Sequence, residues 1–157
     1  MEKIFFILNI SNQKKLNKII LKINSFFKAR KITYFVFQSE YKGHAIKLTK
    51  KAIDEKATSV IACGGDGTVN EIGSLLIGTN IKLGIIPLGS GNGIARHFNI
   101  PFKLNNCLNI IALNKYELID VGKVNSRYFI GNMGVGFESE FIKQYDIFNK
   151  HGFYYYF

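Results

Sequence analysis

The stretch SVIACGGDGTVNEIG, residues 59–73, decides the fold of this 157-residue chain. Its first part, SVIAC, is typical of a buried strand, and a helical pattern begins directly after the glycine-rich GGDGT. Glycines at such a turn let backbone N–H groups approach a ligand closely, and the following helix adds its positive N-terminal dipole. The stretch therefore predicts either a plain strand-to-helix turn or a cradle for an anion.

A second glycine-rich loop follows the next predicted strand. The segment KLGIIPLG, residues 82–89, has the pattern of a strand and runs into GSGNG, residues 89–93. Ligands in open parallel sheets bind at the carboxyl ends of the strands, so two such loops at strand ends favour a phosphate-binding site. The P-loop pattern GxxxxGK[ST] and the dinucleotide fingerprint GxGxxG are both absent, which excludes the commonest nucleotide-binding classes.

The rest of the chain alternates strand and helix patterns. We predict strands at 3–10, 33–39, 59–63 and 82–89, and helices at 14–31, 45–56, 67–79, around 95–97 and at 103–113. The positions expected to face the core in the first two helices are Leu16, Ile19, Ile20, Ile23, Phe27, Ile46, Ala52 and Ile53. This order predicts an α/β fold, a parallel sheet with helices on both faces.

The pattern changes after the fifth helix. Residues 116–124 and 127–137 read as two strands joined at Asn125-Ser126, an antiparallel hairpin. A last helical stretch and an aromatic end, HGFYYYF, follow. We therefore divide the chain into an α/β domain at 1–114 and the beginning of a truncated antiparallel β lobe at 115–157.

The amino-acid composition indicates which classes of partner the protein could bind. The formal net charge is +10, from 21 Lys and Arg against 11 Asp and Glu, which favours polyanionic partners or simply a well-solvated basic surface. Nucleic acid is not expected as a partner, because the basic residues lie on helices without interleaved aromatics.

The two cysteines, Cys63 and Cys107, match no metal or redox spacing, and Cys63 is interpreted as a small core residue. The N-terminus predicts a buried strand rather than a signal peptide, in keeping with a cytoplasmic protein.

The two loops also carry a family resemblance. GGDGTVNE at 64–71 and PLGSGN at 87–92, with GHA at 43–45, DVG at 120–122 and GVGF at 134–137, resemble the diacylglycerol kinase catalytic-domain family, which includes bacterial lipid kinases and sphingosine and ceramide kinases. The resemblance implies a nucleotide-binding lobe like that of NAD kinase and phosphofructokinase. It also implies ATP-dependent, Mg²⁺-dependent phosphorylation of a lipid hydroxyl, diacylglycerol- or sphingosine-type, by a cytoplasmic enzyme that is peripheral at the membrane surface.

The resemblance implies roles for individual residues. Asp66 is implied as catalytic, and Asp66 and Asp120 as the residues associated with Mg²⁺. The implied nucleotide-binding residues are Asn9, Ser39, Gly64, Gly65, Asp66, Gly67, Thr68, Asn70, Glu71, Gly89, Ser90, Gly91 and Asn92.

Some features depart from the family pattern. Many members have Asn-Asp where this chain has Asn92-Gly93, and the first loop after residue 9 lacks the usual Asn-Pro and Gly. The resemblance implies that the general base lies in the C-terminal part of the second lobe. We expect this chain to end before that part and therefore to bind nucleotide with weak or no catalysis. A non-catalytic nucleotide- or lipid-binding module is the alternative. NAD kinase is a further one, although PLGSGN argues against it. A homodimer is left open.

Overall fold

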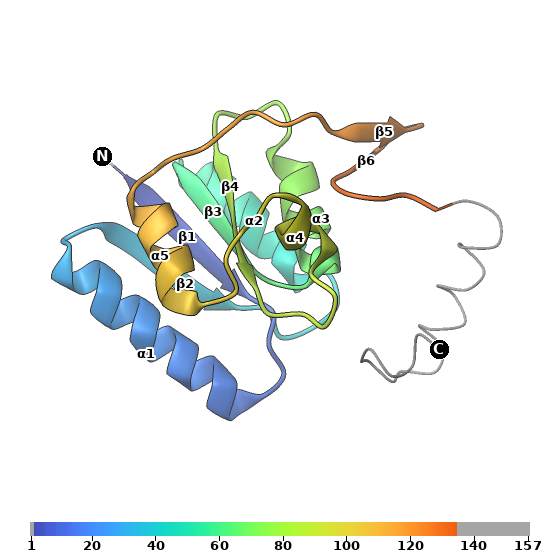
Figure 1. Ribbon diagram of the computed structural model, residues 1–157. Helices are drawn as coiled ribbons and strands as arrows, with labels where there is room; N and C mark the ends of the chain where they lie inside the picture. Colours follow the sequence, from blue (N-terminus) through green and yellow to red (C-terminus); the bar gives the residue numbers. More distant parts are fainter. Residues whose placement is uncertain (1, 135–157) are drawn as a thin grey trace.

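The computed structural model describes residues 2–134 of the chain (Figure 1). Four parallel strands form one sheet in the order β2-β1-β3-β4. The strands are β1 (Lys3–Leu8), β2 (Thr33–Gln38), β3 (Ser59–Gly64) and β4 (Lys82–Pro87). The helices are α1 (Gln13–Ala29), α2 (His44–Asp54), α3 (Asp66–Leu76), α4 (Gly93–His97) and α5 (Leu104–Ala112). The predicted α/β class is confirmed, and each of these elements lies within a few residues of its predicted range.

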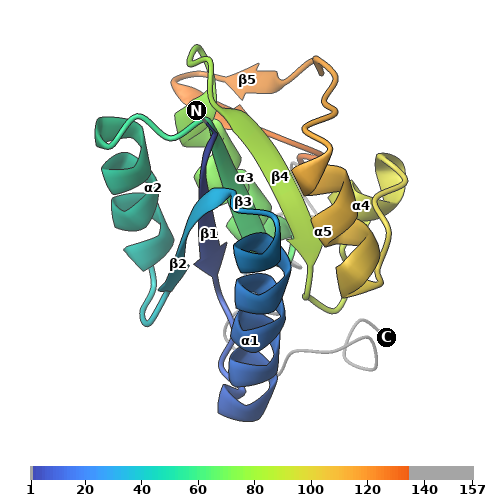
Figure 2. The ribbon, with the colours of Figure 1, turned by 90° about the vertical axis from the view of Figure 1, so that its left-hand side faces the viewer.

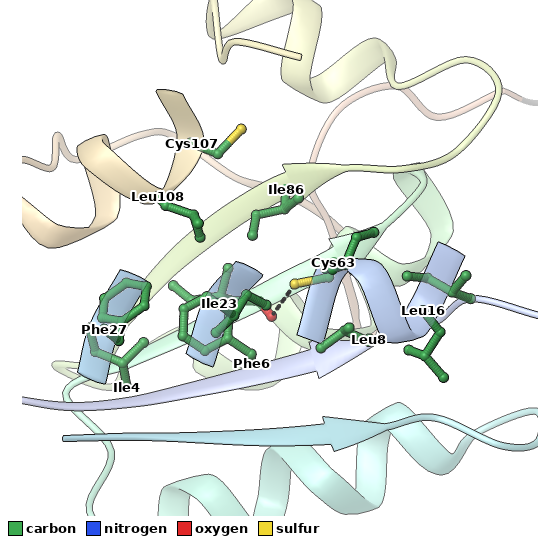
Figure 3. Packing of buried hydrophobic residues seen from close by; sticks show 13 residues of the cluster. Ile4, Phe6, Leu8, Leu16, Ile23, Phe27, Cys63, Ile86, Cys107 and Leu108 are labelled. Carbon is green, nitrogen blue, oxygen red and sulfur yellow. Dashed lines mark hydrogen bonds between the residues drawn. The ribbon is translucent and has the colours of Figure 1, made fainter. Parts of the chain in front are cut away.

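Helices cover both faces of the sheet (Figure 2). On one face α1 and α5 pack against side chains such as Phe6 and Ile86, and on the other α2, α3 and α4 pack against Phe5 and Val60. The first of these two clusters is drawn in Figure 3, where Cys63 lies among aliphatic and aromatic side chains. The central strands β1 and β3 are buried on both faces, which explains their continuous apolar sequence.

The first helix follows the predicted pattern. Its buried residues are Leu16, Ile19, Ile23 and Phe27, while Ile20 is only half-buried. The side chain of Asn12 accepts a hydrogen bond from the backbone N–H of Lys15 at 2.9 Å and so caps the helix N-terminus.

The buried face of α2 differs from its prediction. Ala45, Leu48, Thr49 and Ala52 are buried, whereas the expected core residues Ile46 and Ile53 are half-buried. Thr49 can lie in the core because its hydroxyl donates to the carbonyl of Ala45 at 2.7 Å. The prediction counted only apolar side chains and so missed a buried threonine whose hydroxyl is hydrogen-bonded. The predicted buried face of α2 is therefore turned away from the observed one.

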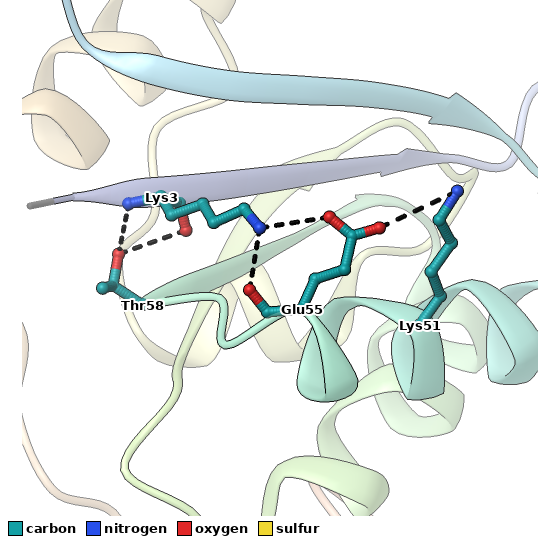
Figure 4. A network of polar contacts seen from close by, with 4 residues as sticks. All are labelled: Lys3, Lys51, Glu55 and Thr58. Carbon is teal, nitrogen blue, oxygen red and sulfur yellow. Dashed lines mark hydrogen bonds and ion pairs between the residues drawn. The ribbon is translucent and has the colours of Figure 1, made fainter.

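A polar network lies at the end of the sheet where the parallel strands begin (Figure 4). The backbone N–H of Lys3 donates to the Thr58 hydroxyl at 2.9 Å, and the Lys3 ammonium contacts both the carbonyl and the carboxylate of Glu55, at 2.8 and 3.1 Å. Lys51 lies 3.9 Å from the same carboxylate. These contacts connect the end of α2 to the start of β1. The polar side chains at this end of the sheet therefore bond to one another and stabilise the fold.

Beyond α5 the chain forms a short antiparallel hairpin of β5 (Gly122–Val124) and β6 (Arg127–Phe129). Asn125 at its turn has a φ of 52°, a left-handed conformation that asparagine tolerates better than most residues. The hairpin is confirmed, but its strands are shorter than predicted. Residues 116–121 and 130–134 form no regular strand, and 135–137 lie outside the described residues. So do the last predicted helix and the aromatic end.

The hairpin region is attached to α3. The backbone N–H of Ile130 donates to the Asn70 side-chain oxygen at 2.9 Å, and the buried Ile130 side chain packs where Gly73 leaves room. Within residues 2–134, no helix has both the length and the apolar character needed to cross a bilayer. The division at 114/115 remains a prediction.

Candidate functional site

The candidate site is the edge of the sheet where all four parallel strands end. Three backbone hydrogen bonds continue the ladder one residue past the strands: Asn9 N–H to Cys63 at 2.9 Å, Ser39 N–H to Leu8 at 2.7 Å, and Leu88 N–H to Gly64 at 2.9 Å. The chain then turns away from the sheet at each strand end, so the predicted residues at 9, 39, 64–71 and 89–92 are brought to one edge.

The two glycine-rich loops contact each other through their backbones. A Cβ atom placed on Gly89 would lie 2.5 Å from the Cα of Gly65 and 3.2 Å from its nitrogen. A Cβ atom on Gly65 would lie 3.3 Å from the Cα of Gly89. Gly64 is equally constrained, because a Cβ there would lie 2.5 Å from the Thr68 hydroxyl oxygen. At least Gly65 and Gly89 are therefore required by close approach, apart from any ligand.

Asn92 fixes the shape of the second loop. Its side-chain oxygen accepts from the Gly89 N–H at 2.9 Å and its side-chain amide donates to the Gly89 carbonyl at 2.7 Å. It is only 6% exposed and has a left-handed φ of 52°. Asparagine suits this position because it supplies a donor and an acceptor and tolerates that backbone conformation. Its predicted nucleotide contact remains a prediction.

Asp66 connects the first loop to the second. One carboxylate oxygen accepts from the Gly93 N–H and the other from the Ile94 N–H, both at 2.9 Å. These two N–H groups are in the first turn of α4, so Asp66 satisfies groups that the helix leaves unpaired. The carboxylate is half-buried, and each of its oxygens retains a further lone pair. This contact between the two loops is not detectable in the sequence pattern.

A first hollow of about 530 Å³ opens beside the ends of β1 and β2. It is lined by the predicted residues Asn9, Ser39 and Glu71 and by the turn at residues 40–43. The Asn9 side-chain amide donates to the Thr68 hydroxyl at 3.0 Å, which connects this hollow to the first glycine loop.

A second hollow of about 720 Å³ lies between the start of α3, α4 and the segment around the hairpin. Its lining includes Asp66, Gly67, Asn70 and Asp120, so the two residues predicted to be associated with a metal line the same hollow. The other side chains and backbone groups around it come from Gly93, Ile94, His97, Phe98, Ile130, Gly131 and Asn132. The predicted Ser90 and Gly91 lie on the exposed part of the second loop and line neither of these hollows.

The described residues contain no cluster of three or more His, Cys, Asp or Glu side chains that could hold a metal ion by themselves. Mg²⁺ commonly uses one or two carboxylates and completes its shell with water and phosphate oxygens. Asp66 and Asp120, which line one hollow, are two carboxylate residues of the kind that such an ion uses, and their role as its ligands remains a prediction.

The two cysteines are not candidates for nucleophilic chemistry. Burial raises the pKa of Cys63 far above its ordinary value, and burial raises the pKa of Cys107 to about 11. Both thiols therefore stay protonated at neutral pH and pack as small core residues, which confirms the prediction for Cys63.

Sequence comparisons identify the family of this chain. Residues 3–124 match the family model of the diacylglycerol kinase catalytic domain. A relative described as a probable YegS-like lipid kinase, from Pectobacterium atrosepticum, is 39% identical over 98 residues, which cover 60% of this chain and 33% of the relative. A second with the same description, from Klebsiella pneumoniae, is 36% identical over 97 residues, with the same coverage. The chain thus spans about a third of the length of these curated relatives.

Solved structures give the same answer for the fold. A candidate diacylglycerol kinase from Bacillus anthracis str. Sterne superposes with a TM-score of 0.72 at 27% identity, over 82% of this chain and 45% of that one. Another structure of a diacylglycerol kinase from that strain has a TM-score of 0.70 over 90% of this chain and 52% of that one, and at 21% identity it supports the fold alone. The chain belongs to the diacylglycerol kinase catalytic domain family of lipid kinases.

Proposed function

We propose that this chain is the nucleotide-binding part of an ATP-dependent lipid kinase that transfers the γ-phosphate of ATP to the hydroxyl of a diacylglycerol- or sphingosine-type lipid. The observation that carries the proposal is the contact between the two glycine-rich loops, at Gly65 and Gly89, directly beside the N-terminus of α3. Family membership supplies the reaction class.

The phosphates of ATP would lie along these loops. Backbone N–H groups at a helix N-terminus favour anions, and glycines let phosphate oxygens come close to the chain. The predicted residues Gly64, Gly65, Gly67 and Thr68 line the first loop, and 89–92 form the second. Asn9 holds the Thr68 hydroxyl in place by its 3.0 Å hydrogen bond. In phosphoryl transfer such positioning provides most of the catalysis.

Asp66 has two roles in this proposal. Its bonds to Gly93 and Ile94 hold the first loop to the start of α4, and Asp66 lines the second hollow together with Asp120. These two carboxylates would hold Mg²⁺, which when bound neutralises charge on the phosphates. We place the acceptor hydroxyl in the same hollow, since that space adjoins both the phosphate loops and the hairpin region.

We also propose that the protein meets its lipid at an anionic membrane surface, through the outward face of α1. Lys14, Lys18 and Lys28 are exposed on that face around Leu21, which is 69% exposed. There is no Asp or Glu between residues 3 and 39. A helix with lysines around an exposed apolar residue suits the interface of an anionic bilayer.

Vesicle sedimentation tests the membrane contact. Each lysine near an anionic surface is worth about 1 kcal/mol, so replacing Lys14, Lys18 and Lys28 together by Gln should weaken binding to phosphatidylglycerol-containing vesicles by about 100-fold. Binding to pure phosphatidylcholine should change little. As a matched control, Lys47, Lys50 and Lys56 on or beside α2 are replaced in the same way. Equal losses for both triple variants would contradict a role for the α1 face.

The reaction itself is tested in two stages. Calorimetry on this chain should show ATP binding that is tighter with Mg²⁺ than without it. A chain that continues through the family's second lobe is then incubated with labelled ATP and, in turn, diacylglycerol, sphingosine, ceramide and NAD. Transfer to a lipid supports the kinase. Transfer to NAD alone, or ATP binding without any transfer, supports NAD kinase or a non-catalytic module instead, and absence of ATP binding refutes the proposal.

A further inference from the structure

The rim of the first hollow carries a stacked pair of aromatic rings. The Tyr41 and His44 rings are nearly parallel, with an interplanar angle of 4° and centroids 4.4 Å apart. Tyr41 lines the hollow and is 52% exposed. His44 therefore covers one face of the Tyr41 ring, and the tyrosine remains accessible on the side of the hollow.

Several bonds hold this pair in place. The His44 Nδ1 accepts from the Glu40 N–H at 3.1 Å, and the His44 N–H donates to the Tyr41 carbonyl at 3.0 Å. Gly43, with a φ of 81°, closes the turn between them. The Lys47 ammonium donates to the Tyr41 hydroxyl at 3.3 Å and is 5.3 Å from the ring centroid, so it sits beyond the hydroxyl end of the ring. The ring is thus oriented before any ligand arrives, which lowers the entropic cost of binding.

The position of the pair relates it to the phosphate loops. Tyr41 shares the first hollow with Asn9, and Asn9 is hydrogen-bonded to Thr68 of the first glycine loop. A ligand with phosphates on that loop can therefore extend into the hollow and bring a planar group to Tyr41. A nucleotide has this combination of a phosphate chain and a flat aromatic base.

We propose that Tyr41, supported by His44, is the stacking platform for the base of the bound nucleotide. This inference rests on the proposed nucleotide-binding function and assigns the end of the ligand opposite the phosphates. Stacking on an aromatic ring accepts any base, because every base has a π face. Tyr41 therefore contributes affinity for the base and little choice among bases.

The test compares two ligands that share the phosphates. Calorimetry with Mg²⁺ measures the binding of ATP and of inorganic triphosphate to the unaltered chain, to Tyr41→Leu and to Tyr41→Phe. Loss of base stacking lowers affinity by about 5- to 150-fold. We expect that loss for ATP with Tyr41→Leu, no change for triphosphate, and near-normal ATP binding with Tyr41→Phe. The matched control is Tyr116→Leu, at a tyrosine that is 67% exposed and packs beside Lys82.

A second readout reports stacking directly. The fluorescence of 2-aminopurine riboside triphosphate should be quenched when it binds to the unaltered chain or to Tyr41→Phe. At a saturating concentration of Tyr41→Leu, the quenching of the bound ligand should be far smaller. Unchanged ATP affinity in Tyr41→Leu, or an equal loss for ATP and triphosphate, would overturn the platform while leaving the nucleotide site intact. If the unaltered chain binds triphosphate but not ATP, or binds neither, the nucleotide-binding proposal fails and this inference fails with it.

Discussion

Replacing Gly89 by alanine tests whether the two glycine loops really pack backbone to backbone. The added Cβ would lie 2.5 Å from the Cα of Gly65 and 3.0 Å from the side-chain oxygen of Asn92. Carbon atoms in contact prefer about 3.5–4.0 Å, so the loops would have to separate by at least about 1 Å. The obstructing atoms belong to the backbone, which cannot rotate away as a flexible side chain could.

The cost can be worked out from these contacts. Inserting a methyl group into a closely packed region costs about 1–3 kcal/mol. Separation of the loops also strains the two bonds between Asn92 and Gly89, at 2.9 and 2.7 Å, each of which contributes about 1 kcal/mol. We therefore expect Gly89→Ala to lower the free energy of unfolding by about 2–4 kcal/mol.

Urea denaturation followed by circular dichroism measures this change. The control is Gly91→Ala in the same loop, where the nearest atom to the new Cβ, a carboxylate oxygen of Asp66, is 3.6 Å away at ordinary contact distance. We expect its free energy of unfolding to stay within about 0.5 kcal/mol of the unaltered chain. Equal stability of the two variants would refute the reasoning, since it would mean that the loops do not constrain each other at Gly89.

Two further predictions follow from the site and the core. Asp66→Asn should abolish Mg²⁺-dependent phosphoryl transfer in an active longer chain. It should also lower the free energy of unfolding by about 1–3 kcal/mol, because one acceptor oxygen is lost beside the two N–H groups of α4. Unchanged stability in urea denaturation would contradict the capping contact. Burial raises the pKa of Cys107 from 9.0 to about 11, so its contribution to stability should be complete below pH 9 and lost as the pH rises toward 11. The free energy of unfolding measured at pH 8, 9, 10 and 11 should fall over the upper part of that range, and Cys107→Ala should fall less steeply if this thiol is the cause.

Much of the fold could be predicted from the sequence because its signals are local. The strands at 59–64 and 82–87 are short, mainly apolar runs, and each is followed by glycines and a helical period. Their parallel arrangement follows from the alternation of strands and helices. The same reasoning correctly placed the two loops at neighbouring strand ends.

The remaining features depend on contacts between distant residues. The Asp66 carboxylate reads as a free ligand in the sequence, yet both of its oxygens bond to Gly93 and Ile94. The strand predicted at 116–124 begins only at Gly122, because β6 is short and pairs with three residues alone. Tyr41 has no sequence signal as a binding residue, since its exposure and its stacking on His44 are properties of the turn geometry.

Helix α3 connects the two hollows. The first glycine-rich loop, which we propose binds phosphate, leads into the N-terminus of this helix, and one turn further Asn70 bonds to the backbone of Ile130 beside the hairpin. The same helix lines the first hollow through Glu71 and the second through Asn70. A nucleotide whose base lies in the first hollow would therefore extend its phosphates across the start of α3 toward the second. The acceptor is then expected from the hairpin side, where Asp120 and Asp66 line the same hollow.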